Sequence, residues 1–300
     1  MGTYHTPVLL EESVSALALH NGGIYADVTF GGGGHSRAIL DRMGEQSKLI
    51  SMDRDTDALA NAPQDKRLIL AHNNFRFLKN YVEYHGYSKI DGILADLGVS
   101  SHQFDTEQRG FSFRFDAPLD MRMNQLAKQT AAQILNNYDL ESLTQILYKY
   151  GEVHNSRRIA NLIYTHRANE QIKTTFDLNR VLAPILPKFG NHKYLAKIYQ
   201  ALRIEVNGEM RALELFLEGS AQILNKGGRL AVITYHSLED RLVKNFMRAG
   251  NSTGLIKKDI YGHFETPFKV ITRKPIVPKE EELSANNRAR SAKLRIAEKS

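Results

Sequence analysis

Four consecutive glycines, Gly31 to Gly34, and an aspartate about 20 residues later are the residues whose types and spacing could bind a cofactor. Glycine has no Cβ, so its backbone can adopt a positive φ and pass within contact distance of a ligand. Asp53 could accept hydrogen bonds from both hydroxyls of a ribose, or it could be a strand-end turn residue or the N-cap of a helix starting near Thr56. The ribose role is favoured, and it predicts a site for an adenosine cofactor.

The glycine run differs from two related phosphate-binding loops. No lysine follows the glycines, which argues against a nucleotide triphosphate loop of the Walker type. Ser36 stands where the dinucleotide fingerprint has its third glycine, which disfavours a nicotinamide-dependent reductase. The His residues show no metal-ligand spacing, so we expect no metal.

Alternating strand and helix patterns must position these residues. Apolar runs rich in strand formers predict strands over Ile24–Phe30, Lys48–Asp53, Arg67–His72 and Ile90–Leu97, with helical spacing between them. An N-terminal helix is expected within His5–Leu19. This rhythm predicts a parallel sheet with crossover helices, whose strand ends meet at one edge.

The rhythm stops after Leu97 and resumes only near residue 229. A loop-like stretch is followed by helical periods from Thr130 to Arg203, which predicts an all-helical insertion. The expected division is therefore residues 1–104 with 205–300 in a sheet domain, and residues 105–204 in the insertion.

The sheet is expected to close after the insertion. Glu205–Leu224 reads as a long amphipathic helix that Gly227-Gly228 would cap. Arg229–Tyr235 is a central strand by its apolar content, and Ser237 is the expected N-cap of the next helix, with Asp240 at its third position. The expected closing strands are Leu255–Asp259, Phe268–Arg273 and Leu294–Ala297.

The composition indicates a reducing compartment and a polyanionic binding partner. It has no cysteine, and no apolar stretch approaches the roughly 18 residues needed to span a bilayer, so we expect a cytoplasmic protein without membrane contact. The net charge is +7, with an excess of +6 between Glu141 and Arg203 and +5 from Lys269 to Ser300. Two basic segments on a mildly acidic body favour nucleic acid as the partner over a membrane.

Long motifs spread over the chain carry a resemblance to a known family. They run from about Tyr4 to Ala297 and are similar to those of the bacterial small-subunit (16S) ribosomal RNA cytosine-N4 methyltransferases. One departure is Phe115-Asp116-Ala117, where the family has a glycine before the proline. The motifs are His5-Thr6-Pro7-Val8-Leu9-Leu10, Gly33-Gly34-His35-Ser36, Asp96-Leu97-Gly98-Val99-Ser100-Ser101, Arg109-Gly110-Phe111-Ser112-Phe113, Pro118-Leu119-Asp120-Met121-Arg122-Met123, His236-Ser237-Leu238-Glu239-Asp240-Arg241 and Arg288-Ala289-Arg290-Ser291.

The resemblance implies a Rossmann-like class I methyltransferase sheet, an α/β fold, with an all-helical inserted domain. It implies methyl transfer from S-adenosylmethionine to the exocyclic amine of a cytidine in the decoding centre of the small ribosomal subunit. The cofactor contacts that it implies fall on Gly33, Gly34, His35, Asp53, Phe75, Asp96 and Gln103. Phe75 could instead be a core aromatic, and Gln103 a plain loop residue.

Two strand-end residues are candidates for catalysis. Asp96, at the end of the fourth strand, could accept a hydrogen bond from the substrate amine and hold it in line for transfer. A backbone carbonyl of Leu97-Gly98 could do the same. His236 follows a strand and could be a proton acceptor, although a lone histidine is more often structural.

Arginine and phenylalanine alternate just past the fourth strand. Arg109, Phe111, Phe113, Arg114 and Phe115 could stack on an extruded base and contact phosphate, or the phenylalanines could pack the insertion, and at least one is expected in a core. Further phosphate contacts are predicted at Arg122, Arg157 and Arg158. An alternative function is a non-catalytic RNA-binding assembly factor that keeps the fold. The sequence leaves open whether the chain forms a homodimer.

Overall fold

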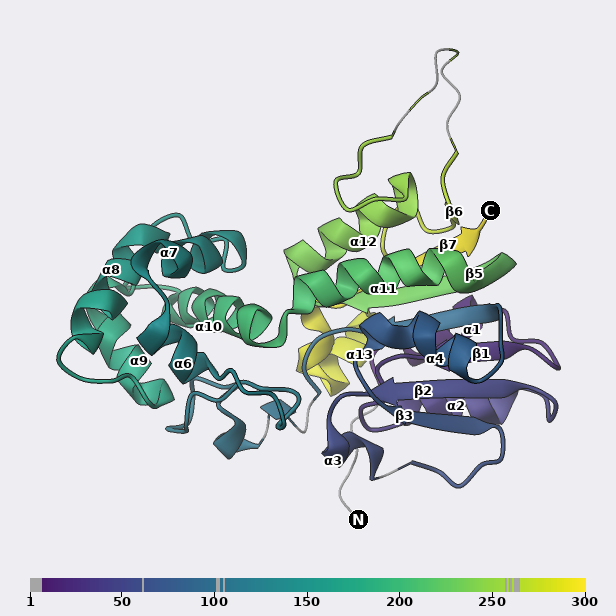
Figure 1. Ribbon diagram of the computed structural model, residues 1–300, viewed down its shortest axis with the longest axis horizontal. Coiled ribbons are helices and arrows are strands. Elements are labelled where there is room, and N and C mark those ends of the chain that lie inside the picture. Colours follow the sequence, from purple (N-terminus) through teal and green to yellow (C-terminus); the bar gives the residue numbers. More distant parts are fainter. Residues whose placement is uncertain are drawn as a thin grey trace. The chain divides into compact units, whose positions relative to one another are not determined.

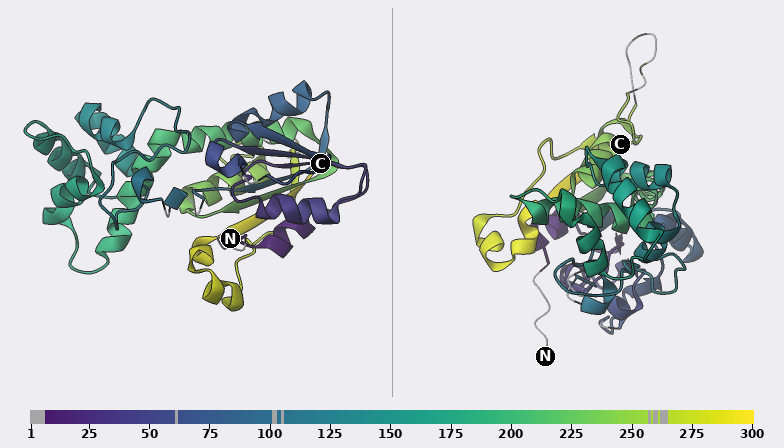
Figure 2. Two further views of the ribbon diagram at one scale, coloured as in Figure 1. Left: turned by 90° about the horizontal axis from the view of Figure 1, so that it is seen from below. Right: turned by 90° about the vertical axis from the view of Figure 1, so that its left-hand side faces the viewer.

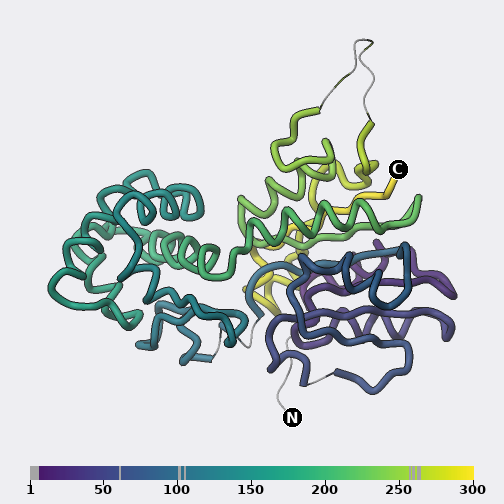
Figure 3. The backbone as a smooth tube through the Cα atoms, viewed as in Figure 1, coloured from purple at the N-terminus to yellow at the C-terminus, as the bar shows by residue number. Residues whose placement is uncertain are grey.

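A computed structural model describes residues 7–60, 62–100, 103–104, 106–256, 258, 261 and 265–300. The chain forms two compact units (Figures 1 and 3). Unit 1 is Met1–Gly98 with Met210–Ser300, and unit 2 is Val99–Glu209. The predicted insertion, residues 105–204, lies inside unit 2. Each unit is described by itself below.

Unit 1 is built on a seven-stranded sheet in the order β3-β2-β1-β4-β5-β7-β6. The first five strands of that order pair in parallel, and β7 is antiparallel to both β5 and β6. This is the predicted Rossmann-like α/β sheet. The strands are β1 (Ile24–Asp27), β2 (Lys48–Asp53), β3 (Leu68–His72), β4 (Ile90–Asp96), β5 (Leu224–Thr234), β6 (Phe268–Val270) and β7 (Lys293–Lys299).

Helices cover both faces of this sheet (Figure 2). Helices α4, α11 and α12 pack on one face, where Phe216 and Phe246 meet the sheet residues Ile93 and Val232 in one apolar cluster. Helices α1 and α2 pack on the other face, around Tyr25 and Ile233. The helices of unit 1 are α1 (Leu10–Ala16), α2 (Gly34–Arg42), α3 (Thr56–Leu59), η1 (Phe75–Phe77), α4 (Leu78–Tyr84), α11 (Glu209–Ile223), α12 (Ser237–Ala249), α13 (Glu280–Ala285) and η4 (Asn287–Ser291).

Unit 2 has helices and an apolar core of its own. Its elements are η2 (Glu107–Arg109), α6 (Ala131–Asn137), α7 (Leu140–Lys149), α8 (Ser156–Arg167), α9 (Thr175–Leu182), η3 (Ala183–Ile185) and α10 (Asn191–Asn207). Thr130 and Thr174 begin α6 and α9 with reciprocal capping boxes, which satisfy backbone donors at both helix starts. None of the described helices in the chain is long and apolar enough to cross a membrane.

Two predicted helix boundaries are wrong. Helix α10 continues through Glu205 and ends at Gly208, whose φ of 57° is the left-handed conformation that stops a helix. Helix α11 ends at Ile223 and passes directly into β5, so Gly227 (φ 81°) lies within β5 and does not cap the helix.

The described residues of the predicted strand Leu255–Asp259 are not part of the sheet. Residues 255, 256 and 258 have no regular structure, and residues 257 and 259 lie outside the described part of the chain. His5 and Thr6, at the start of the expected N-terminal helix, also lie outside it, and α1 begins at Leu10. Within the part of the chain that the structure describes, β6 and β7 close the sheet.

Candidate active site at the carboxyl edge of the sheet

The glycine loop joins β1 to α2 at the edge where the parallel strands end. Gly31 and Gly33 have φ values of 50° and 75°, which β-branched or bulky residues rarely adopt. A Cβ on Gly33 would lie 2.7 Å from the Phe30 ring, and one on Gly34 would lie 2.1 Å from Cγ of Pro7. Two glycines are therefore required by packing, and the loop backbone stays bare of side chains.

Asp53 ties this loop to the end of β2. Its Oδ2 accepts a hydrogen bond from the Gly31 amide at 2.8 Å, and its Oδ1 accepts one from the Asp55 amide at 2.9 Å. Burial raises the pKa of the Asp53 carboxyl. The N-cap of α3 is Asp55, which accepts from the Asp57 amide at 3.2 Å, so the capping alternative for Asp53 is wrong.

A buried carboxyl group that the sequence analysis did not select lies at the end of β1. Asp27 has no solvent exposure; its Oδ2 accepts a hydrogen bond from the Ser36 hydroxyl at 2.6 Å and its Oδ1 accepts one from the Thr29 amide at 3.2 Å. Burial raises its pKa. The available signal was an aspartate that ends a strand just before a glycine turn.

Asp96 ends β4 and faces the same edge. Its amide donates to the Thr29 hydroxyl at 2.6 Å, and its Oδ1 accepts a hydrogen bond from the Tyr235 hydroxyl at 2.8 Å. Burial raises the pKa of the Asp96 carboxyl to about 6, and the nearby Asp27 and Glu239 carboxylates add to that rise. His35 and the Tyr235 hydroxyl act in the opposite direction. The Asp96 side chain is 23% exposed to solvent, so a ligand can reach it.

His35 links the glycine loop to Asp96. Its Nε2 lies 3.2 Å from the carbonyl oxygen of Val8. A carbonyl oxygen only accepts, so Nε2 carries the hydrogen and the ring is held in one orientation. Its Nδ1 then lies 3.8 Å from Oδ2 of Asp96. The structure thus brings Gly33, His35 and Asp96 together as predicted from the sequence, and adds Asp27 and Tyr235.

His236 begins α12 as its N-cap. Its Nδ1 accepts from the Glu239 amide at 3.4 Å, while Oε2 of Glu239 accepts from the Tyr235 amide at 2.9 Å. The predicted cap at Ser237 is off by one residue, and Asp240 instead forms an ion pair with Arg295. His236 therefore stabilises the helix start, and its catalytic role stays a prediction.

Phe75 and Gln103, predicted to contact the cofactor, have local partners. Phe75 opens η1 half-buried, with its ring 5.5 Å from that of Phe216 at 74°. Gln103 is buried in unit 2, where its Oε1 accepts from the Ser100 amide at 3.2 Å. The contact of each with a cofactor stays a prediction.

The predicted substrate residues all lie in unit 2, in two kinds of environment. Arg109 is buried and donates to the carbonyl oxygens of Arg122 and Met123, and Phe111 is buried in the unit 2 core. Arg122 forms a two-pronged ion pair with Asp120 at 2.6–2.7 Å. These contacts hold the loop together and leave the predicted RNA contacts of the three residues as predictions.

The remaining predicted substrate residues are more exposed. The side chain of Arg157 is 71% exposed, 3.8 Å from Glu141, and Arg158 is exposed beside it on α8. Phe113 packs its ring 5.5 Å from that of Tyr199, whereas Arg114 and Phe115 are exposed. Their contacts with RNA also stay predictions.

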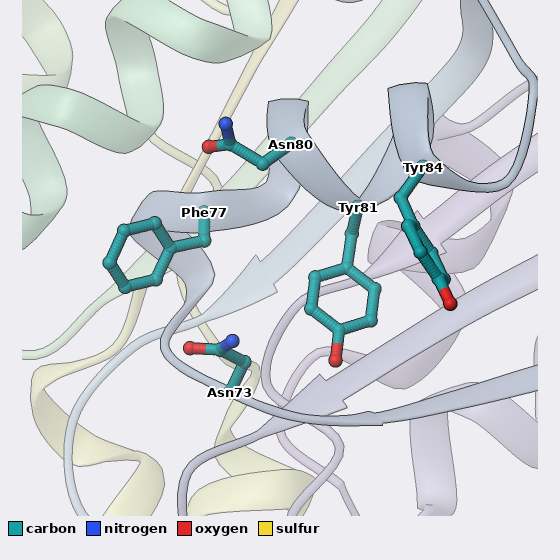
Figure 4. Close-up of a pocket in the computed structure, with 5 residues that line it drawn as sticks. All are labelled: Asn73, Phe77, Asn80, Tyr81 and Tyr84. Atoms are coloured by element: carbon teal, nitrogen blue, oxygen red, sulfur yellow. The ribbon is translucent and has the colours of Figure 1, made fainter.

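A cavity of about 440 Å³ that the sequence analysis did not predict lies beside α4 (Figure 4). Asn73, Phe77, Asn80, Tyr81 and Tyr84 line it. Asn73 follows β3 and donates its amide to the carbonyl oxygen of Asp53 at 2.8 Å, so this wall adjoins the loop edge. None of the predicted site residues lines this cavity; Asp53 is connected to it only through the hydrogen bond from Asn73.

Comparison with known proteins identifies the family. Three curated relatives, each named ribosomal RNA small subunit methyltransferase H, match over nearly the whole chain. The relative from Parabacteroides distasonis is 53% identical to this chain, and the match covers 99% of this chain and 97% of the relative. The relative from Flavobacterium johnsoniae is 54% identical and the one from Bacteroides fragilis is 52% identical. Each of these two matches covers 99% of this chain and 98% of the relative. The family description that matches residues 2–300 is the MraW methylase family. The chain therefore belongs to the MraW methylase family.

Proposed function

We propose that this protein is an S-adenosylmethionine-dependent methyltransferase that methylates N4 of a cytidine in the decoding centre of 16S ribosomal RNA. The observation that carries the proposal is the juxtaposition, at one sheet edge, of a bare glycine loop, the Asp53 carboxyl group and the Asp96 carboxyl group. Family membership and the names of the relatives support the reaction and the RNA. We propose that unit 1 binds the cofactor and that unit 2 recognises substrate.

The residues present fit the cofactor. A Cβ on Gly31 would meet no atom nearer than 3.9 Å, so the loop leaves open space beside its backbone. The two oxygens of Asp53 each accept one backbone hydrogen bond, which leaves acceptor capacity for ribose hydroxyls. The backbone of Gly33, Gly34 and His35 would hold the methionine portion, and Phe75 would lie along the adenine.

S-adenosylmethionine, when bound, supplies a methyl group on a positively charged sulfur, which departs without needing a proton. The work left to the protein is to orient a poor nucleophile, since the cytosine N4 lone pair is delocalised into the ring. We assign the Asp96 carboxylate to accept a hydrogen bond from that amine and to take its proton after attack. The Tyr235 hydroxyl donates a hydrogen bond to this carboxylate and fixes its position.

The proposal extends to the setting of the reaction. We expect the enzyme to act in the cytoplasm on the small ribosomal subunit or its RNA, without a metal ion. The basic segments of the chain suit an RNA partner, since Lys and Arg neutralise phosphate charge. A homodimer would be compatible with this role.

The proposal is tested by mapping the masses of small-subunit RNA fragments from cells that lack this protein. We expect one cytidine in the decoding centre to lose a methyl group, and the wild-type gene to restore it. Asp96→Asn should fail to restore it. A complete set of methyl groups in the deletion strain would refute the proposed substrate, and full restoration by Asp96→Asn would remove the carboxylate from the mechanism.

Cofactor binding is tested separately by calorimetry. Asp53→Ala should weaken binding of S-adenosylmethionine by roughly 10- to 100-fold, as expected for charge-assisted hydrogen bonds contributing about 1.5–3 kcal/mol. Asp57→Ala is the matched control, because it removes an aspartate from the neighbouring helix α3. Equal affinities of the two variants would show that the ribose assignment is wrong.

A further inference from the structure

A second cavity in unit 1, of about 260 Å³, lies between helix α12 and the edge of the sheet at β6 and β7. Met247 and Val270 give it apolar walls. Four cationic side chains surround it: Lys244 and Arg248 from α12, Arg273 after β6, and Arg295 from β7. The cavity is separate from the glycine loop and from Asp96, and the mechanism above makes no use of it.

The alternation of β7 concentrates positive charge on this side of the sheet. Lys293, Arg295 and Lys299 are separated by even numbers of residues and therefore point to the same face, that of α12. Glu298 points to the opposite face, where it pairs with Arg229 at 2.8 Å. Asp240 is the acid that the structure pairs with this cluster. It contacts Arg295 at 2.6 Å and Lys293 at 3.5 Å.

The cations of the cavity differ in how they are held. Arg295 is buried and fixed by Asp240, and Arg248 donates to the carbonyl oxygen of Gly254 at 2.9 Å. Lys244 and Arg273 are exposed, and neither has an ion-pair partner among the residues that the structure describes. A concave site with two free cations and one buried guanidinium favours an anion over a neutral ligand.

We propose that this cavity binds a phosphate of the substrate RNA backbone and so anchors the RNA at a distance from the reacting cytidine. The inference rests on the proposed function, because it assumes an RNA substrate. At 260 Å³ the cavity is smaller than the roughly 300–1,000 Å³ typical of pockets for drug-sized ligands, which suits one phosphate group. The anchoring contact is independent of base identity and contributes affinity, not sequence choice.

The position of α12 connects the cavity to the proposed active site. The helix starts at Ser237, directly after Tyr235 and His236 at the carboxyl edge of the sheet. Lys244 and Arg248 lie further along it, about 10 to 16 Å from its start at 1.5 Å per residue. A strand whose target base reaches Asp96 would pass along α12 and place in the cavity a backbone phosphate that is not adjacent to that base.

The test removes the charges of Lys244 and Arg273 and compares this variant with one that loses two positive charges elsewhere in unit 1. The pocket variant is Lys244→Gln with Arg273→Gln. The control is Lys66→Gln with Lys226→Gln, two exposed lysines near the amino ends of β3 and β5. The probe is a fluorescein-labelled single-stranded RNA with the decoding-region sequence, and its anisotropy is titrated between 50 and 200 mM KCl.

The pocket variant should bind this RNA about 10-fold more weakly at 100 mM KCl than the control. Its slope of log affinity against log salt should fall by about 0.7, the value for one lost phosphate contact with a single strand. Lys244→Arg with Arg273→Lys keeps the charge and should restore most of the affinity. Calorimetry with S-adenosylmethionine should give the same affinity for all variants, since the glycine loop is untouched.

The outcomes separate the inference from the proposed function. Equal affinity and equal salt slope in the pocket and control variants would overturn the inference. Weak binding by the charge-preserving variant as well would also overturn it, because the loss would then come from packing. Failure of the wild-type protein to methylate small-subunit RNA would refute the proposed function, and the RNA-binding comparison does not depend on that result.

Discussion

At the residue scale, the ionised form of Asp96 that the proposed mechanism needs is also the form that destabilises the folded state. Burial raises its pKa to about 6, and the nearby Asp27 and Glu239 carboxylates add to that rise. The Tyr235 hydroxyl and His35 partly offset this cost by favouring the charged form. At pH 7 most molecules therefore carry the carboxylate that the proposed mechanism requires, but the folded state is destabilised by holding it.

Asp96→Asn should stabilise the protein at high pH. A carboxyl group whose folded pKa is raised from 3.8 to about 6 contributes stability that is fully present below its unfolded pKa and is lost as the pH rises through 6. At 1.36 kcal/mol per pKa unit the loss approaches about 3 kcal/mol, and residual exposure reduces it to about 1–2 kcal/mol. Urea unfolding of the wild-type protein and of Asp96→Asn at pH 4 and pH 8 measures this difference in stability. A mutational effect that is the same at both pH values would contradict the raised pKa.

Tyr235→Phe should move the acid limb of the activity profile to higher pH. The pKa of the Tyr235 hydroxyl is raised well above its ordinary value, so the group stays protonated and donates to Asp96. Without this donor the Asp96 carboxylate loses a charge-assisted hydrogen bond, and its pKa rises by about one unit. We expect kcat/KM to fall about 5- to 10-fold near pH 6 and little at pH 8.5. Tyr84→Phe, on an 83% exposed tyrosine, is the control; identical profiles would show that Tyr235 does not position Asp96.

At the element scale, the turn between β1 and α2 combines backbone conformation with tight packing. Gly33→Ala would place a Cβ at a residue with φ 75° and 2.7 Å from the Phe30 ring. Gly86→Ala shares the first penalty only, because Gly86 has φ 80° and no atom within 4 Å of a built Cβ. We expect Gly86→Ala to cost about 1 kcal/mol of unfolding free energy and Gly33→Ala about 2–4 kcal/mol. Denaturant titration measures both, and equal costs would show that the ring does not constrain the loop.

The elements were predictable where local pattern and tertiary packing agree. The predicted strand Lys48–Asp53 matches the bounds of β2, because its buried apolar run ends at a clear turn signal. The failures lie where a local signal was overridden. Gly227-Gly228 looks like a helix C-cap, but the β5–β4 ladder takes up the chain from Leu224. Ser237 is a better cap than histidine by propensity, yet Glu239 closes a capping box on His236.

The candidate site was predictable only in part, for the same reason. Gly33, His35, Asp53 and Asp96 stand in recognisable motifs, and the structure brings them to one edge. Tyr235 is 139 residues from Asp96 in sequence, and no local pattern indicates their hydrogen bond. Such contacts follow from strand order, since β4 and β5 are neighbours in the sheet although the whole of unit 2 separates them in the chain.

At the scale of the whole molecule, each unit buries an apolar cluster of its own. Unit 2 leaves unit 1 after Gly98 and returns at Met210, so it is inserted into a sheet whose strands come from both sides of it. A domain with its own core can in principle fold alone. This organisation predicts that cofactor binding and substrate recognition are separable.

Replacing unit 2 with a flexible linker should therefore abolish methyl transfer but preserve folding of the sheet. We would join Gly98 to Met210 by about 12 Gly and Ser residues, which span roughly 20 Å. Thermal unfolding of this shortened protein should remain cooperative, and calorimetry should still detect S-adenosylmethionine. Asp53→Ala in the same background is the control and should lower that affinity as it does in the full chain. Gln103, a predicted cofactor contact, belongs to unit 2. If the shortened protein binds as well as the full chain, Gln103 contributes nothing; if it binds no cofactor while still folding cooperatively, unit 1 does not hold the cofactor site alone.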